Sequence, residues 1–115
     1  IVAVGLNYRD HARELGMALV EFGEGAEEDL DRILAHWMVH EPAAADARIR
    51  EVIDGCAVLE AHPLIGRPLA DDKRELVIGS RARGYVALYR YVEAVELVVI
   101  LAIRAQRERG YARGL

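Results

Sequence analysis

The sequence predicts an α+β protein in which a helical hairpin packs on an antiparallel sheet, with the element order β-α-α-β-β-β. Two amphipathic helical patterns follow each other between residues 26 and 61, and three β-type runs follow between residues 75 and 103. Short connections join these segments, which favours antiparallel neighbours. A chain of 115 residues is long enough for one domain with a single hydrophobic core.

The first predicted elements are a short strand and a long helix. Ala18–Phe22 is β-prone, and two glycines interrupt it directly afterwards. From Ala26 onward, apolar residues recur at three- and four-residue spacing, which predicts one buried stripe along a helix. Pro42 ends this helix because proline cannot continue the hydrogen-bonding pattern. The predicted stripe comprises Leu30, Ile33, Leu34, Trp37 and Met38.

The second helix is predicted over Ala43–Ala61, with Pro42 in its first turn. The connection is so short that the two helices must form an antiparallel hairpin. Cys56 is the only cysteine, which excludes an internal disulfide and suits a reducing compartment. Its place in the apolar stripe favours a buried small hydrophobe over a reactive thiol. The stripe comprises Ile49, Val52, Ile53, Cys56 and Leu59.

Three strands are predicted after an irregular loop at His62–Pro68, where two prolines flank a glycine. The strands are Glu75–Ile78, Tyr85–Tyr91 and Leu97–Ile103, and their short connections predict an antiparallel meander. The middle strand carries three tyrosines on one face, where packing is the ordinary role of aromatic side chains. The last strand is apolar throughout, which predicts a central strand covered on both faces.

Charge is unevenly distributed along the chain, whose net charge is −4. Residues 17–64 hold eleven acidic and three basic residues, whereas residues 65–115 hold ten basic and six acidic residues. This asymmetry predicts an acidic side and a basic working side, the latter at the β-rich end. No apolar run approaches the length of a membrane span, and a cytoplasmic protein without a membrane partner is expected. The histidines lack metal-ligand spacing, so neither a metal nor a cofactor is expected.

Five short motifs occur in a characteristic order over residues 17–115. They are Ala26-Glu-Glu-Asp-Leu-Asp-Arg-Ile-Leu, His62-Pro-Leu-Ile-Gly-Arg-Pro, Arg74-Glu-Leu, Gly84-Tyr with Leu88-Tyr-Arg, and Ile103-Arg with Arg107-Glu-Arg-Gly-Tyr. In this order and spacing they resemble the RelE/ParE superfamily, the toxins of bacterial type II toxin–antitoxin modules. The resemblance implies the RelE/ParE-like fold and a cognate antitoxin of the ParD or RelB kind as partner.

The resemblance leaves the target of the toxin open. The ParE branch poisons DNA gyrase, whereas the RelE branch cleaves mRNA on the ribosome. The ribonuclease branch commonly has an arginine at the position of Val86, and its members tend to be strongly basic, whereas this chain has a pI near 5.6. Both departures favour a ParE-like gyrase inhibitor. The alternatives are a RelE-like ribosome-dependent mRNA endonuclease and an inactive relative that only binds its antitoxin as a co-repressor.

The candidate site residues come from the β-rich end. If the protein is a ribonuclease, the resemblance implies a catalytic role for Arg74, Arg90, Arg104, Arg107 and Tyr111. The target-binding candidates are Arg104, Arg107, Arg109 and Tyr111. The ordinary alternative is that Arg74 and Arg90 pair with acids across the strands and that the last arginines form a solvated turn.

The first sixteen residues follow a different pattern. Asn7-Tyr-Arg-Asp-His11-Ala-Arg-Glu14 resembles a segment of the fumarylacetoacetate hydrolase family, in which the histidine and the glutamate form a catalytic pair. That family binds a divalent metal through Glu-x-Glu, and the nearest match here, Ala94-Val-Glu96, lacks the first glutamate. A His–Glu pair without the metal cannot polarise a carbonyl substrate. Residues 1–16 are therefore interpreted as an appended segment, and residues 17–115 as the toxin domain.

Overall fold

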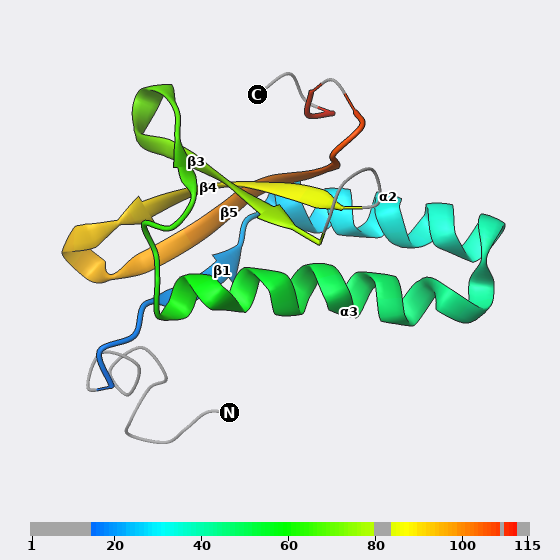
Figure 1. Ribbon diagram of the computed structural model, residues 1–115, viewed down its shortest axis with the longest axis horizontal. Coiled ribbons are helices and arrows are strands. Elements are labelled where there is room, and N and C mark those ends of the chain that lie inside the picture. The colour runs from blue at the N-terminus through cyan, green and yellow to red at the C-terminus, as the bar shows by residue number, and fades with distance from the viewer. Residues whose placement is uncertain (1–14, 80–83, 109, 113–115) are drawn as a thin grey trace.

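The computed structural model describes residues 15–79, 84–108 and 110–112. The segment that resembles a hydrolase, apart from its last two residues, lies outside these ranges, as does Arg109. The elements are β1 (Leu19–Phe22), α2 (Glu24–His40), α3 (Ala45–Cys56), β2 (Arg67–Pro68), β3 (Lys73–Ile78), β4 (Tyr85–Val92) and β5 (Leu97–Ala105) (Figure 1).

One five-stranded sheet, in the order β1-β5-β4-β3-β2, organises the fold. The antiparallel meander of β3, β4 and β5 is confirmed, and the α+β fold class with it. β1 pairs with β5 in parallel, which is possible because the hairpin and the meander separate the two strands in sequence. The loop that was predicted to be irregular contains β2, a two-residue strand that pairs with β3.

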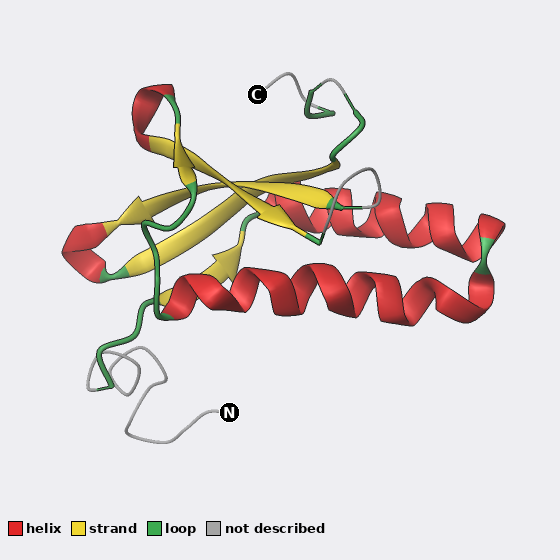
Figure 2. Ribbon diagram, viewed as in Figure 1, coloured by secondary structure: helices red, strands yellow, loops and turns green. Residues whose placement is uncertain are grey.

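The two helices lie side by side on one face of the sheet and form the predicted hairpin (Figures 1 and 2). The second helix is shorter than predicted, because 3₁₀ turns at Pro42–Ala44 and Ala57–Glu60 replace its two ends. The second of these turns is fastened to the start of β1, where the Ala18 N–H donates to the Glu60 carbonyl at 2.8 Å. The hairpin is thus attached to the edge strand as well as to the sheet.

The helix stripes are buried where they meet the sheet. Ile33, Val52 and Cys56 are buried as predicted, whereas Met38 is 54% and Ile53 40% exposed. Met38 lies near the tip of the hairpin, which extends beyond the strands (Figure 1). Ile53 follows Val52, and successive helical residues point in different directions, so only one of them can face the sheet.

The sheet buries one face fully and the other in part. Tyr85 and Tyr89 point into the core, as predicted for the tyrosine face. Along β5, Val98 and Ile100 are fully buried, but their neighbours Leu97, Val99 and Leu101 are only half-buried. The prediction that β5 is covered on both faces was therefore wrong in part, because the helices cover a single face. The opposite, helix-free face receives the segment that follows β5.

No helix in the described ranges is long and apolar enough to cross a membrane.

Candidate functional site

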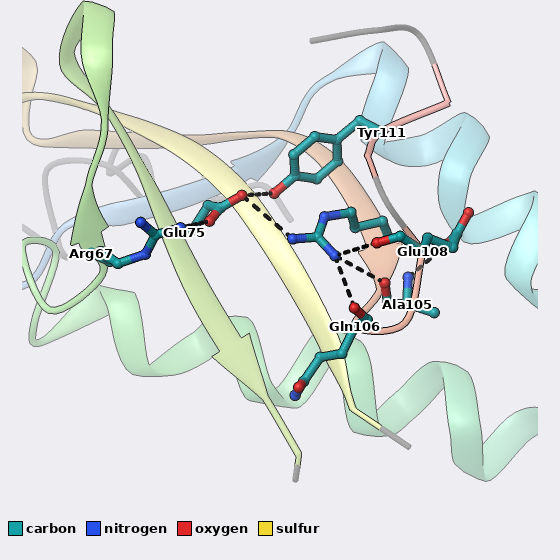
Figure 3. A network of polar contacts seen from close by, with 7 residues as sticks. Arg67, Glu75, Ala105, Gln106, Glu108 and Tyr111 are labelled. Atoms are coloured by element: carbon teal, nitrogen blue, oxygen red, sulfur yellow. Dashed lines mark hydrogen bonds and ion pairs between the residues drawn. The ribbon is translucent and has the colours of Figure 1, made fainter. Parts of the chain in front are cut away.

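Arg104 lies at the centre of a polar network on the helix-free face of the sheet (Figure 3). Its neighbour Ile103 is buried in the core, so alternation along β5 directs Arg104 to the other face. The Nη1 of Arg104 donates to the carbonyls of Ala105, Gln106 and Glu108 at 3.2, 3.2 and 3.0 Å. Its side chain is only 17% exposed. The side chain of Arg104 therefore stabilises the turn at residues 105–108, which we call the C-terminal turn.

Glu75 on β3 gathers three side chains around its carboxylate. Tyr111 Oη donates to Glu75 Oε2 at 2.6 Å, and Arg67 Nη2 donates to Oε1 at 2.5 Å. Arg104 Nη2 lies 3.8 Å from Oε2, and the Arg104 guanidinium stacks 5.2 Å from the centre of the Tyr111 ring. Burial and the hydrogen bond to Glu75 raise the pKa of Tyr111, against the opposing effect of Arg104. These contacts fix the segment after β5 to the sheet.

A second set of contacts attaches the C-terminal turn to the helical hairpin. Glu108 accepts a hydrogen bond from the Ala105 N–H at 2.7 Å and lies 3.6 Å from Arg32 of α2. Arg32 in turn lies 3.6 Å from the buried Asp29. The other carboxylate oxygen of Asp29 accepts a hydrogen bond from the Ile103 N–H at 2.8 Å. The turn is therefore held from the helix layer and from the sheet at once.

Arg74 and Arg90 lie elsewhere on the sheet and bind backbone carbonyls. Arg74 Nη1 donates to Leu64 and Gly66 at 3.0 and 2.9 Å, and Arg90 Nη2 donates to Asp71 at 3.1 Å. Both arginines hold loops, and within the described ranges neither forms the acid pairs considered from the sequence.

The distance along the sheet separates these two arginines from the C-terminal turn. Arg90 pairs with Val99, five residues before Arg104 on β5, so at about 3.3 Å per residue the two positions lie roughly 16 Å apart. The structure brings Arg104 and Tyr111 together at Glu75, places Arg107 on the C-terminal turn that Arg104 holds, and leaves Arg74 and Arg90 apart from them.

A cleft of about 660 Å³ opens between the hairpin and the C-terminal turn. Arg107 is exposed at this cleft and makes no hydrogen bond or ion pair within the described part of the chain. Trp37 Nε1 donates to Tyr85 Oη at 2.9 Å, and the Arg48 guanidinium lies 4.7 Å from the centre of the Trp37 ring. The lining residues are Arg32, Ile33, His36, Trp37, Arg48, Gly84, Tyr85, Ala105, Arg107 and Glu108.

Sequence reasoning missed the acidic members of this site. In the sequence, Glu75 was noted only as part of the motif Arg74-Glu-Leu. Side chains alternate along a strand, so Glu75 and Arg74 point to opposite faces of the sheet. Its contact with Tyr111 depends on the register of three strands and on the return of the chain after β5. The role of Arg48 at the cleft likewise depends on how the hairpin packs.

The described residues offer groups for binding anions rather than metals. Among them, no three His, Cys, Asp or Glu side chains gather in a way that could hold a metal ion. His36 and His40 stack with ring centres 4.2 Å apart, and His40 Nδ1 lies 2.8 Å from the His36 carbonyl. Arg107, whose guanidinium has no partner among the residues that the structure describes, can meet an incoming carboxylate or phosphate.

Comparison with known proteins supports one family. Residues 20–110 match the family model of the ParE toxin of the type II toxin–antitoxin system parDE. The chain is 38% identical over 95 residues to Toxin RelE3 of Caulobacter vibrioides, which covers 81% of this chain and 99% of that toxin. The chromosomal ParDE system of P. aeruginosa shares the fold with a TM-score of 0.66 and 24% identity, over 77% of this chain and 96% of that one. The RelBE2 toxin–antitoxin complex of Mycobacterium tuberculosis shares it with a TM-score of 0.56 and 24% identity, over 80% and 94%.

Proposed function

The chain belongs to the ParE family of type II toxins, and we propose that it inhibits DNA gyrase in the bacterial cytoplasm and is neutralised by a cognate antitoxin. The proposal assigns Arg107, with its neighbour Arg109, to contact with gyrase. Arg104 and Tyr111 position the segment that carries them. The toxin domain is assigned to residues 17–115, and residues 1–16 to an appended segment.

The proposal rests on one observation: Arg104 and Tyr111 both contact the carboxylate of Glu75. Cleavage of RNA by its 2′-hydroxyl needs a base for that hydroxyl and free cations around the phosphate. Arg104 donates to three carbonyls and faces a carboxylate, so its charge is already compensated. Tyr111 has a raised pKa and therefore keeps its proton at neutral pH, which disfavours a role as base.

Val86, a residue of β4, also argues against ribonuclease activity. It is 5% exposed and pairs with Arg104 across β4 and β5. The ribonuclease branch commonly has an arginine at this position. The apolar side chain of Val86 cannot provide the positive charge with which an arginine at this position would bind a phosphate.

The alternative function is ribosome-dependent mRNA cleavage, which the name of the relative Toxin RelE3 favours. It would require Arg104 and Tyr111 to leave Glu75 when RNA binds. Net negative charge opposes binding to a polyanionic ribosome.

Induced expression of the full chain in bacteria tests the proposal. The measurements are a DNA-damage reporter and the rate of protein synthesis, followed from the moment of induction. We expect the reporter to rise and cells to filament while translation initially continues. Early arrest of translation with mRNA cut on ribosomes, and a silent reporter, would establish the ribonuclease alternative. Unchanged growth would favour the inactive co-repressor.

A further inference from the structure

A second hollow, of about 470 Å³, is lined by the loop before β3, the start of β3 and the end of β4. Lys73 and Arg90 lie in its wall, five residues along the sheet from Arg104 and the C-terminal turn. We propose that this hollow binds a nucleoside 5′-monophosphate, with the phosphate between Lys73 and Arg90. The site is separate from the surface assigned to gyrase, so the inference goes beyond the proposed function.

The cation pair is the first argument. Lys73 lies directly opposite Arg90 across β3 and β4, where like charges repel each other, and both residues are half-buried. Within the described ranges, the Lys73 ammonium has no hydrogen bond or ion pair, and the one polar contact of the Arg90 side chain is to the uncharged Asp71 carbonyl at 3.1 Å. An oxyanion between the two cations would replace repulsion by attraction.

Two carboxylates also line the hollow, and they suit a different part of the ligand. Asp72 and Glu93 are exposed, and within the described part of the chain neither forms an ion pair with Lys73 or Arg90. Water and salt screen exposed charges more strongly than half-buried ones. Ionised carboxylates only accept hydrogen bonds, and in dinucleotide sites they bind ribose hydroxyls. The two acids can therefore meet the sugar of a nucleotide and leave the phosphate to the cation pair.

The remaining walls of the hollow are largely apolar and are formed before a ligand binds. Leu64, Leu69, Tyr91 and Val92 belong to the lining, and such side chains suit the flat face of a base. Arg74 Nη1 donates to the Leu64 carbonyl at 3.0 Å, so the loop that carries Leu64 is held in place by the sheet. A wall that is already ordered reduces the entropic cost of binding.

Size and charge favour a single nucleotide over smaller or larger phosphates. The volume of about 470 Å³ falls in the range of small-molecule pockets, about 300–1,000 Å³, and inorganic phosphate would fill little of it. A phosphate monoester carries close to two negative charges at neutral pH, which matches the two cations. A polynucleotide would be repelled by the net charge of −4 of the chain, whereas a mononucleotide mainly meets the local cation pair.

Lys73 is the single lysine of the chain, so lysine labelled with carbon-13 at Cε gives one resonance, which reports on the wall of the hollow. The probe is adenosine 5′-monophosphate, titrated into the purified full chain. The controls are adenosine, which lacks the phosphate, and inorganic phosphate, which lacks the nucleoside. We expect a saturable shift of the Lys73 resonance with the nucleotide, an affinity at least about tenfold weaker for inorganic phosphate, and no saturation with adenosine.

Three variants locate the interaction. Arg90→Gln retains the lysine probe and should weaken binding of the nucleotide about tenfold, as expected for a charged hydrogen-bonding contact. Lys73→Gln removes the other cation, and isothermal titration calorimetry should show a loss of similar size. Arg50→Gln replaces an exposed arginine of α3 that does not line the hollow, and it should leave the affinity unchanged. Thermal unfolding checks that each variant is folded, and one folded cation variant suffices for the test.

Four results would overturn the inference: no saturation at about 10 mM nucleotide, equal affinity for the nucleotide and one of its controls, tighter binding of the oligonucleotide dT10, or unchanged affinity in the cation variants. These outcomes are distinct from failure of the proposed function. A chain that inhibits gyrase but ignores the nucleotide would refute this site alone. A chain that binds the nucleotide but spares gyrase would refute the proposed target alone.

Discussion

Tyr111 donates a 2.6 Å hydrogen bond to Glu75, which lies 36 positions earlier in the chain. The bond connects the segment after β5 to the helix-free face of the sheet, where Arg104 approaches the same carboxylate (Figure 3). The position of Arg107 therefore depends on a contact that involves neither Arg107 nor its neighbours in sequence.

Replacing Glu75 by glutamine should lower the pKa of Tyr111, because the tyrosinate would no longer meet a negative carboxylate. Ultraviolet titration of tyrosinate should show one group that ionises at lower pH in E75Q than in the parent. Tyr111→Phe identifies this group by removing it. An identical titration curve in the parent and in E75Q would mean that the two side chains do not interact in solution.

The same contact gives stability a defined pH dependence. The pKa of Tyr111 in the folded protein is raised above its ordinary value of 10.0, so the folded state holds this proton more tightly than the unfolded chain. The stabilisation is complete below about pH 10 and decreases as the pH rises through the higher folded-state pKa. Tyr111→Phe should reduce this alkaline loss of stability, which urea unfolding at pH 8 and pH 11 measures.

Gly66 should not tolerate even a methyl group. A Cβ at this position would lie 2.6 Å from Tyr89 Cε1 and 2.8 Å from the Glu75 carbonyl oxygen. Gly66→Ala must displace Tyr89, whose hydroxyl accepts from the Gly66 N–H and donates to the Pro63 carbonyl. We expect a loss of about 1–3 kcal/mol in the free energy of unfolding. Gly110→Ala is the control, because among the described residues beyond its chain neighbours no atom lies within 4 Å of a Cβ added there. Equal stability of both variants would contradict the packing described for this loop.

Asp29 should contribute strongly to stability. It is 1% exposed, and it accepts the hydrogen bond of the Ile103 N–H. Asp29→Ala leaves that donor unpaired in the interior, which costs about 2–3 kcal/mol. Asp31→Ala removes an exposed carboxylate from the same helix and should change the free energy by less than about 0.5 kcal/mol. Urea unfolding of both variants measures the difference, and a mild effect at Asp29 would show that α2 is not fastened to β5 through it.

Cys56 should be inert in the folded protein. It is fully buried, and burial raises the pKa of its thiol to about 12. At pH 8 only about one thiol in ten thousand would then be the reactive thiolate. Ellman's reagent should label Cys56 slowly in buffer and rapidly in denaturant. Rapid labelling of the native protein would place Cys56 outside the core.

Periodicity predicted most of the fold because helices and strands carry their burial pattern locally. Ile33, Val52 and Cys56 recur at helical spacing, and they are the residues that meet the sheet. Met38 fits the same spacing but lies near the tip of the hairpin, beyond the strands, and sequence spacing does not show how far the sheet extends. The parallel partner of β1 and the two-residue β2 also depend on tertiary packing.

The candidate site was less predictable, because its members come from distant segments. The sequence placed Arg104, Arg107 and Tyr111 at one end of the sheet, and the structure brings Arg104 and Tyr111 into contact and places Arg107 on the turn between them. It also suggested Arg74 and Arg90, which the register places four and five residues away from Arg104 along the strands. Glu75 and Arg48 acquire their roles through contacts across the fold, which no local pattern encodes.

A supercoiling reaction with purified DNA gyrase tests the proposed target most directly. The full chain, Arg107→Gln and Arg50→Gln are added in increasing amounts to gyrase and relaxed plasmid. The proposal predicts that the full chain and R50Q inhibit supercoiling equally, and that R107Q is about tenfold weaker, as for an arginine at the centre of an interface. Undiminished supercoiling at a large excess of the full chain, in a preparation that cuts mRNA on ribosomes, would contradict it.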